Sequence, residues 1–293
     1  MLLRKGLAVG IILLLVAIAY APAIAQNTEK QSESRGAWLY VGGSGPGNYT
    51  RIQDAINNAS DGDTVFVYDD SSPYIGNIIV NKSINLIGEN CYSTIIYNNN
   101  QSILIEIFND NVTITGFTLQ NLHRYGIYIH FVDNIVISHN RIIDDHSILI
   151  QSHGSNIKIF SNEFTSLYDT ALVIWDGDNV EIFRNNFTEC SDLFWLSFTP
   201  YARVYENNFL SYKGAYMLWD ASLSDVLSPS KKIWFYHNYW FRPRLLPKPI
   251  ISSVIIWFSL ISNFLEMPVY LIIPWILFDW HPAQEPYDIS GIS

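Results

Sequence analysis

Short runs of alternating apolar and polar residues recur along the chain at intervals of about 22–23 residues. Four copies begin at an Asn, and the copies place apolar residues at alternate positions, as in Asn134-Ile-Val-Ile-Ser-His-Asn140 and Asn156-Ile-Lys-Ile-Phe-Ser-Asn162. This alternation is typical of a β-strand with one buried face. Further copies begin at Asn111, Asn179, Tyr201 and Lys232, with a degenerate one at Ser83.

A second alternating run lies between consecutive copies. Its apolar positions are Ile127 and Ile129, Ile148 and Ile150, Leu172 and Ile174, Phe194 and Leu196, and Tyr216 and Leu218. Two or three such strands cannot bury a face alone, but coils stacked about 4.8 Å apart place each apolar column over the next. The spacing therefore predicts an all-β solenoid, a parallel β-helix with about 22–23 residues per coil. A leucine-rich repeat has a similar period but would show a Leu-x-x-Leu-x-Leu frame.

An asparagine recurs at the turn that follows each first run. Stacked amides can hydrogen-bond along a solenoid axis as a ladder, and one buried amide left unpaired costs about 1–3 kcal/mol. We therefore predict such a ladder of Asn140, Asn162, Asn185, Asn207 and Asn238.

A helix is predicted over 50–60, ahead of the repeats. Thr50 and Gln53 fit a capping box, and the residues Ile52, Ala55, Ile56 and Ala59 form one apolar stripe. Because a solenoid must cover its open ends, we expect this helix to act as an N-terminal cap.

The opening of the repeat region resembles a known family. The segments are Tyr49-Thr-Arg-Ile-Gln-Asp-Ala-Ile56, Gly62-Asp-Thr-Val65 and Asn77-Ile-Ile-Val-Asn-Lys-Ser-Ile-Asn-Leu-Ile-Gly88. They are similar to exported right-handed parallel β-helix proteins of the pectin-lyase-like superfamily, closest to the NosD-like group of periplasmic copper-binding proteins. The resemblance covers roughly residues 38–240 and implies a right-handed helix and export. That superfamily includes polysaccharide lyases, hydrolases, epimerases and adhesins.

Residues 1–25 have the three parts of a secretory signal peptide: basic Arg4 and Lys5, an apolar run and the exit Ala23-Ile24-Ala25. An uncleaved anchor helix is the alternative. We expect a linker at 26–37, the β-helix with its N-terminal cap at 38–245, and an apolar C-terminal extension at 246–293. The chain is therefore expected in the periplasm, outside the cell or at its surface.

The composition excludes two classes of protein. The chain is 49% hydrophobic and 15% charged, with a net charge of -10. A disordered chain is less apolar and more charged, and a nucleic-acid binder carries a basic excess to meet phosphates. No nucleic-acid partner is therefore expected.

The apolar stretch 250–278 has two interpretations, because Glu266, Pro268 and Pro274 interrupt it. It is either a cap or lid on the solenoid, or an anchor that associates with a membrane. Basic residues on its N-terminal flank, Arg242 and Arg244 among them, oppose the positive-inside preference for a spanning segment. We prefer a lid or cap on the solenoid, and the outer face of the second run offers a place for it. A disulfide between Cys91 and Cys190 is left open, since sequence does not give their separation.

Aromatic residues at outward positions of the second run suggest a carbohydrate-binding face, since aromatic planes suit the CH faces of sugars. The candidates are Tyr128, Trp175, Trp195 and Trp219, and Asp145, Asp176 and Asp178 would hold hydroxyls or calcium. The expected partner is a polysaccharide or a cell-surface component.

Histidine spacing suggests two other chemistries. His130, His153 and Asp176 recur at the period of one coil and would form a metal site on adjacent coils. Copper, which the resemblance implies, would bind through such histidines, because the chain has no closely spaced Cys or Met motif. Catalytic candidates for a lyase or epimerase are Arg124, Asp145 and His146. The leading hypothesis remains ligand binding without catalysis.

Overall fold

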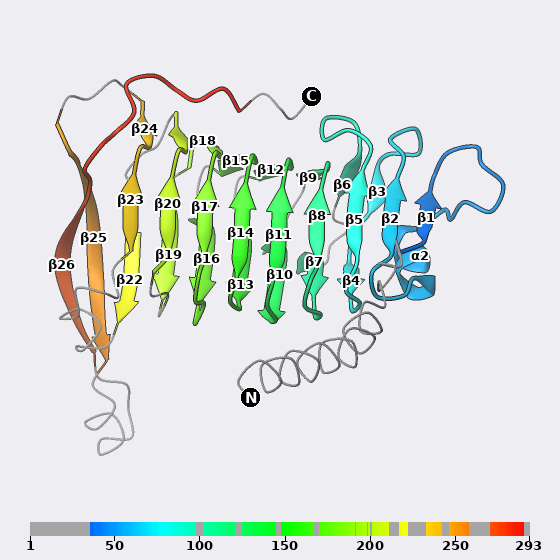
Figure 1. Ribbon diagram of the computed structural model, residues 1–293, viewed down its shortest axis with the longest axis horizontal. Coiled ribbons are helices and arrows are strands. Elements are labelled where there is room, and N and C mark those ends of the chain that lie inside the picture. Colours follow the sequence, from blue (N-terminus) through cyan, green and yellow to red (C-terminus); the bar gives the residue numbers. More distant parts are fainter. Residues whose placement is uncertain are drawn as a thin grey trace, which may run out of the picture. The chain divides into compact units, whose positions relative to one another are not determined.

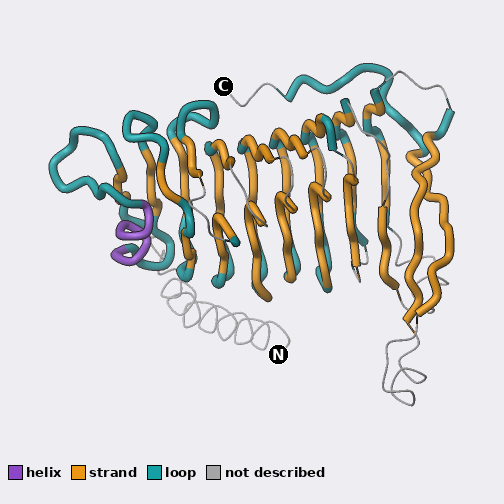
Figure 2. The backbone as a smooth tube through the Cα atoms, turned by 180° about the vertical axis from the view of Figure 1, so that it is seen from behind, coloured by secondary structure: helices purple, strands orange, loops and turns teal. Residues whose placement is uncertain are grey.

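The computed structural model describes residues 36–97, 102–120, 125–144, 148–166, 170–190, 192–197, 199, 201–210, 217–221, 233–241, 246–257 and 270–289, some strand residues beside the gaps by their backbone alone. Residues 1–35, which contain the predicted signal peptide and most of the predicted linker, lie outside them. Within them the chain forms helix α2 (Ile52–Asn58) and strands β1 to β26, which stack side by side along the long axis (Figures 1 and 2).

The strands form three columns, in which each strand pairs with its counterpart in the neighbouring coil. The first column contains β4 (Ile78–Val80), β7 (Ile103–Ile107), β10 (Tyr125–Phe131), β13 (Ile148–His153), β16 (Thr170–Trp175), β19 (Asp192–Ser197), β22 (Met217–Ala221) and β25 (Lys248–Trp257). The second column contains β1 (Trp38–Val41), β2 (Thr64–Val67), β5 (Asn85–Gly88), β8 (Thr113–Thr115), β11 (Ile135–Ser138), β14 (Ile157–Phe160), β17 (Glu181–Phe183), β20 (Arg203–Tyr205), β23 (Trp234–Tyr236) and β26 (Tyr270–Asp279). The third column contains β3 (Tyr74–Ile75), β6 (Ile95–Tyr97), β9 (Thr118–Gln120), β12 (Arg141–Asp144), β15 (Glu163–Ser166), β18 (Asn186–Thr188), β21 (Asn208–Phe209) and β24 (Tyr239–Trp240).

Pairing is parallel in all three columns, and the first two join in one 18-stranded sheet. The third column is a separate 8-stranded sheet. The prediction of a parallel β-helix is therefore confirmed.

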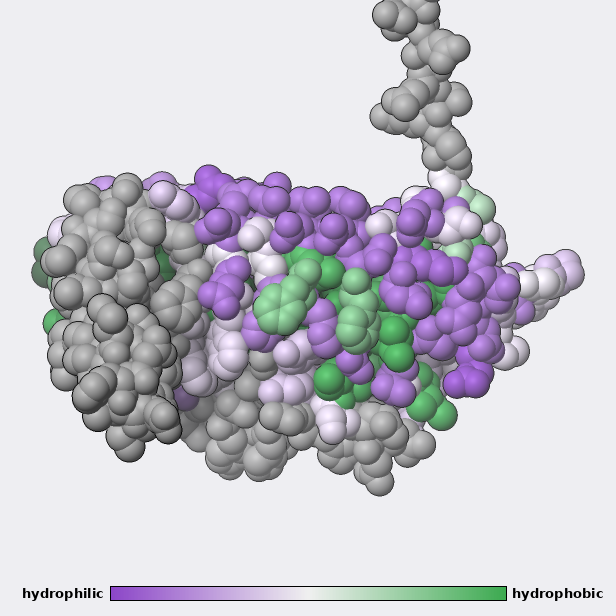
Figure 3. Space-filling view, turned by 90° about the horizontal axis from the view of Figure 1, so that it is seen from below, coloured by the Kyte–Doolittle hydropathy of each residue, from purple (hydrophilic) through white to green (hydrophobic). Residues whose placement is uncertain are grey.

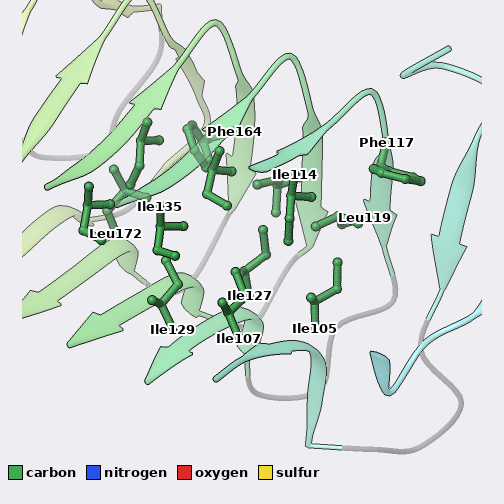
Figure 4. Packing of buried hydrophobic residues seen from close by; sticks show 14 of the residues in the cluster. Ile105, Ile107, Ile114, Phe117, Leu119, Ile127, Ile129, Ile135, Phe164 and Leu172 are labelled. Atoms are coloured by element: carbon green, nitrogen blue, oxygen red, sulfur yellow. The ribbon is translucent and has the colours of Figure 1, made fainter. Parts of the chain in front are cut away.

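The apolar positions of both sequence runs point into the solenoid (Figure 4). Ile127, Ile137 and Ile159 are fully buried, as the alternation predicts. The third column adds a stack of Phe164, Phe187, Phe209 and Trp240, whose ring centroids lie 4.9, 5.2 and 4.2 Å apart in turn. Since each buried apolar side chain contributes roughly 1.5–3 kcal/mol, the columns hold the coils together.

The asparagine ladder is confirmed. All five members are fully buried, and Nδ2 of each of the first four donates to the Oδ1 of the Asn on the next coil at 3.0 to 3.2 Å. Each Nδ2 also donates to carbonyls of its own and the preceding coil, such as Phe160 and Ile137 for Asn162. The aligned amides therefore provide hydrogen-bond partners for the buried polar groups of the turn.

The ladder ends on a carboxylate that the sequence did not indicate. Oδ2 of Asp279, a fully buried residue, accepts hydrogen bonds from Asn238 N at 2.9 Å, Asn238 Nδ2 at 3.0 Å and Trp240 Nε1 at 3.0 Å. Because each amide in the ladder donates to an oxygen on the next coil, an acceptor with no donor of its own completes the ladder at this end.

A second set of asparagines lies at the start of the second-column strands. Asn111, Asn134, Asn156 and Asn179 have φ of 58, 61, 55 and 54°. Asn adopts this left-handed conformation more readily than other residues with a side chain. Asn134 and Asn179 also donate to the preceding member at 3.1 and 2.8 Å, which explains why these four copies begin with Asn.

Helix α2 packs against β1, β2 and β4, and its predicted stripe is buried at Ile52, Ala55 and Ile56. The predicted capping box is wrong. The helix begins after Arg51, which makes no side-chain capping bond. Gln53 instead bonds the backbone of Ile79 through both its amide oxygen, at 2.8 Å, and its nitrogen, at 3.1 Å. The Gln53 side chain therefore binds the backbone of the neighbouring coil, whereas in a capping box it would bind the backbone at the start of its own helix.

The described part of the apolar stretch does not cover the outer face of the first column, so for these residues that expectation is wrong. β25 pairs in parallel with β22 and then antiparallel with β26, which adds a hairpin at the end of the sheet (Figure 1). From Asp279 the chain returns along the third column, where Tyr287 N donates to Asn208 Oδ1 at 2.8 Å. Among the described residues, no helix has the length and apolar character to cross a membrane.

The pairing of β19 with β22 corrects one inward position. Phe194 lies opposite Met217, Trp195 opposite Leu218 and Leu196 opposite Trp219. The sequence alternation predicts Leu218 in the inward register and leaves Met217 and Trp219 out of it. These two coils are one residue further apart in sequence than that interpretation assumed, and a shift of one residue reverses the alternation for the whole strand.

Candidate functional site

The outer side of the first column carries a continuous row of aromatic and histidine rings. This outer aromatic face consists of Glu106, Phe108, Tyr128, His130, His153, Trp175 and Trp195. Its strand members alternate with fully buried residues such as Ile129 and Ile174, so they point away from the core. Strands β7 and β10 end at the lower edge in Figure 1, and apolar side chains gather among polar ones when the solenoid is seen from below (Figure 3).

The rings contact one another from coil to coil. His130 stacks on Phe108 with centroids 3.8 Å apart, and it also contacts Tyr128 at 4.6 Å. His153 lies 5.1 Å from Trp175 at 85°, and Trp175 lies 5.7 Å from Trp195 at 59°. The rings of His153, Trp175 and Trp195 are thus tilted and do not stack face to face, whereas Phe108 and His130 cover each other's faces.

A second aromatic row, on the outer side of the second column, has a different geometry. Phe160, Phe183, Tyr205 and Tyr236 stack with centroids 4.9 to 5.0 Å apart and planes within 10° of parallel. Each ring face is covered by its neighbour, so this row stabilises the coils and offers a ligand only ring edges. The outer aromatic face is therefore the better candidate for stacking on a ligand.

Polar groups accompany the rings. His130 Nε2 lies 3.2 Å from Glu106 Oε2, and Tyr128 Oη lies 3.2 Å from His153 Nε2. Among the described residues, the indole N–H groups of Trp175 and Trp195 are buried without a hydrogen-bond partner. Buried donors normally have one, so the two indoles retain donor capacity at this face.

Burial lowers the pKa of His153, while the nearby Asp176 carboxylate raises it to a lesser extent. The folded protein therefore holds His153 neutral at pH values where an exposed histidine takes up a proton. A neutral Nε2 can accept the hydroxyl proton of Tyr128, which agrees with their 3.2 Å separation.

We expect the free energy of unfolding to fall as the pH drops from 7.5 to 5.5. The unfolded chain binds protons at histidine through this range, whereas His153 and His139, whose pKa burial also lowers, resist protonation when folded. Denaturant unfolding at both pH values checks this. His153→Gln should reduce the pH dependence and His139→Gln/His153→Gln should reduce it further; a double variant with the full wild-type slope would contradict the assignment.

His130 and Asp176 both lie near enough to His153 to affect its pKa, but the predicted trio is not placed to hold a metal ion. Ile129 pairs with Ser152 but Phe131 with His153, so β10 has one extra residue at His130. His130 therefore aligns with Phe108 and Glu106, and Asp176 is an exposed residue with φ of 53° just after β16. No group of three His, Cys, Asp or Glu side chains in the described part of the chain is placed to hold a metal ion.

The other predicted site residues do not all lie on the outer aromatic face. Arg124, Asp145 and His146 lie outside the described residues. Trp219 pairs with Leu196 rather than with Ser197, so its register differs from that of Trp175. Tyr128, Trp175 and Trp195 do share one face. Sequence reasoning missed Glu106 and Phe108, although each precedes a member of the face, Tyr128 or His130, by one coil period.

The two cysteines make no functional site that we can identify. Both thiols are buried and are not bonded to each other. Burial raises the pKa of the Cys91 thiol to about 11, which keeps it in the unreactive protonated form.

A cleft of about 520 Å³ lies between α2 and strands β3 and β4. Two of its polar side chains are already used. Gln53 bonds Ile79, and the Tyr74 hydroxyl donates to the Tyr68 carbonyl at 2.6 Å. Gln53 and Tyr74 therefore already have hydrogen-bond partners within the protein, which leaves the cleft with fewer polar side chains for a ligand.

Residues 102–218 match a family model described as a right handed beta helix region. The matched segment runs from β7 into β22 and contains the outer aromatic face. The chain is a parallel β-helix protein. No curated protein matches it. The strand pairing and the family match thus support the parallel β-helix class for this chain. The narrower resemblance to the NosD-like group stays a prediction.

Proposed function

We propose that the chain is an exported β-helix protein that binds a polysaccharide along the outer aromatic face without catalysis. The row of tilted rings across neighbouring coils is the observation that carries this proposal. Sugar CH faces would stack on the exposed ring surfaces. Glu106 and Asp176 would accept hydrogen bonds from sugar hydroxyls.

The test is binding on a glycan array, followed by titration of the best ligand. Trp195→Ala and Trp175→Ala should each weaken binding about three- to tenfold, which corresponds to the roughly 0.5–1.5 kcal/mol typical of an aromatic contact. Phe183→Ala is the matched control, since its ring stacks at similar spacing between Phe160 and Tyr205 on the other face. Binding that both tryptophan variants leave unchanged would rule out this face as the site.

A lyase or epimerase is the second candidate, and the contact of Tyr128 with His153 favours it. A phenol hydrogen-bonded to a neutral imidazole can serve as an acid and base pair. Arg124, Asp145 and His146 would supply the remaining groups. Uronate polymers incubated with calcium and the wild-type chain would then give unsaturated or epimerised product, which Tyr128→Phe would abolish. No product with the wild-type chain would exclude this candidate.

Copper handling, which the NosD-like resemblance implies, fits the described residues poorly. His130 is engaged by Glu106 and stacked on Phe108, and no three ligands converge among them. We therefore derive no step through copper. Elemental analysis of the purified chain tests this directly, since stoichiometric copper would contradict it.

We further propose that α2 closes the N-terminal end of the solenoid and the β25–β26 hairpin the C-terminal end. The buried stripe of α2 and the pairing of β25 with β22 support these roles. Export would follow from residues 1–25, so the exported chain should begin at Gln26 when its N-terminus is sequenced.

A further inference from the structure

Carboxylates border the outer aromatic face on the side where the first-column strands end. We name this group, which consists of Asp110, Asp133, Asp176 and Asp178, the acidic edge. All four residues are exposed and lie in the turns that follow β7, β10 and β16. Figure 3 views the solenoid from this side and shows hydrophilic side chains beside the apolar ones. The face itself adds the carboxylate of Glu106.

Hydrogen bonds between coils hold two of these carboxylates in place. Oδ1 of Asp110 accepts a bond from Asp133 N at 2.8 Å, and Oδ1 of Asp133 accepts one from Ser155 N at 2.8 Å. Because each bond joins neighbouring coils, the carboxylates recur at the strand spacing of about 4.8 Å. The acidic edge is therefore a row of negative charge at fixed positions along the axis.

Glutamates away from this face have arginine partners, but Glu106 does not. The pairs are Arg141–Glu163, Arg184–Glu206 and Arg203–Glu181. Glu106 instead lies beside the histidine His130, at 3.2 Å. No lysine or arginine occurs in the strands and turns of the face, which are segments 103–112, 125–134, 148–156, 170–179 and 192–197. A ligand on these segments therefore meets negative charge, which repels an anionic polymer.

Two exposed phenylalanines lie next to the carboxylates. Phe131 is 80% exposed and Phe108 is 44% exposed. They come two residues before Asp133 and Asp110 in the same turns. An aromatic ring attracts a cation that approaches its face within about 6 Å. Rings beside carboxylates thus suit a ligand that combines apolar surface with positive charge.

The spacing of the carboxylates favours a polymer over a single amine. Glu106 is on β7, and Asp176 follows β16, three coils further along the solenoid. At about 4.8 Å per coil, the two residues are roughly 14 Å apart along the axis. One ammonium group cannot contact both carboxylates, whereas a chain with repeated ammonium groups can.

We propose that the outer aromatic face binds an amino-sugar polysaccharide whose amino groups are free and protonated. This inference rests on the proposed function and specifies its substrate class. Sugar rings stack on the aromatic side chains, and the ammonium groups form charge-assisted hydrogen bonds with Glu106 and the acidic edge. An N-acetylated polymer lacks the positive charge, and a uronate polymer carries the opposite charge.

Calorimetric titration of the full chain with three hexasaccharides tests the substrate class. The ligands are hexamers of glucosamine, N-acetylglucosamine and galacturonate, at a pH at which the glucosamine amine is protonated. We expect the glucosamine hexamer to bind at least about tenfold more tightly than the N-acetyl form, because several exposed ion pairs contribute together. The galacturonate hexamer should bind most weakly of the three.

The variant Glu106→Gln/Asp176→Asn should weaken binding of the glucosamine hexamer about three- to tenfold and leave that of the N-acetyl form unchanged. Asn suits residue 176, whose φ is 53°. The matched control is Glu285→Gln, which removes a charge from an exposed residue on the segment that returns along the third column. It should bind like the wild-type chain, and thermal unfolding shows whether each variant is folded.

Failure of this inference and failure of the proposed function give different results. If the N-acetyl or galacturonate hexamer binds at least as tightly as the glucosamine hexamer, and Trp175→Ala weakens that binding, the site binds polysaccharide but the amino-sugar class is wrong. If hexalysine binds as tightly as the glucosamine hexamer and Trp175→Ala changes neither, the face recognises charge alone and the inference is wrong. If no hexasaccharide binds the wild-type chain, the proposed function fails and this inference fails with it.

Discussion

Asp279→Ala is expected to lower the free energy of unfolding by about 2 kcal/mol or more, because it removes the shared acceptor of buried donors at roughly 1–3 kcal/mol for each bond that is not replaced. Asn238 N and Trp240 Nε1 donate to Oδ2 of Asp279 at 2.9 and 3.0 Å. Asn238 Nδ2 donates to the same oxygen at 3.0 Å, but it keeps the carbonyls of Val204 and Tyr236 as acceptors. Water cannot replace the carboxylate easily, since Asp279 is fully buried.

The loss should begin at the C-terminal coils. Repeat proteins are stabilised by contacts between neighbouring units, so releasing Asn238 weakens the last coil first. Hydrogen exchange should rise in β23 and β24 before it rises in β11 and β12, and thermal unfolding should shift to lower temperature. Asp279→Asn is the control, because its side-chain oxygen can still accept the bonds from Asn238. If Asp279→Ala and the wild-type chain have the same free energy of unfolding, the ladder does not depend on this terminus.

The regular part of this fold can be predicted from sequence because it repeats. Alternation at Ile135 and Ile137, or Ile157 and Ile159, gives the inward face of each strand, and the spacing between copies gives the length of the coil. The Asn ladder follows in the same way, since a fixed position in every coil must stack on itself. In a solenoid, a correct strand assignment for one coil therefore predicts the strands of the neighbouring coils.

The exceptions are places where the period is broken. The extra residue at His130 takes that residue out of register with His153 and places its ring on Phe108, which no fixed spacing could indicate. One added residue likewise reverses the alternation between Phe194 and Met217. Asp279 was missed because its partner Asn238 lies far earlier in the chain, across a segment that does not repeat. The tryptophans of the candidate face could be predicted from sequence, but the contacts that orient its histidines could not.

Phe187→Ala is expected to cost about 3–5 kcal/mol, the range for removing a large aromatic side chain from a core. Phe187 is fully buried. Its ring lies between Phe164 and Phe209 at 4.9 and 5.2 Å, and it also contacts Phe194 edge-on at 5.5 Å. The cavity would open in the middle of the stack, where neighbouring coils are held at the strand spacing and cannot close it.

Phe183→Ala, in the same coil, separates burial from stacking. Phe183 also lies between two aromatic rings, Phe160 and Tyr205, at 4.9 and 5.0 Å, but on the outer side, where it is only partly buried. Stacking alone contributes about 0.5–1.5 kcal/mol, so this variant should lose much less stability than Phe187→Ala in denaturant unfolding. Equal losses would mean that stacking along the axis stabilises the coils as much as burial does. A larger loss for Phe187→Ala would show that filling the interior dominates, since the two side chains differ in burial while the number and spacing of their stacked neighbours are nearly the same.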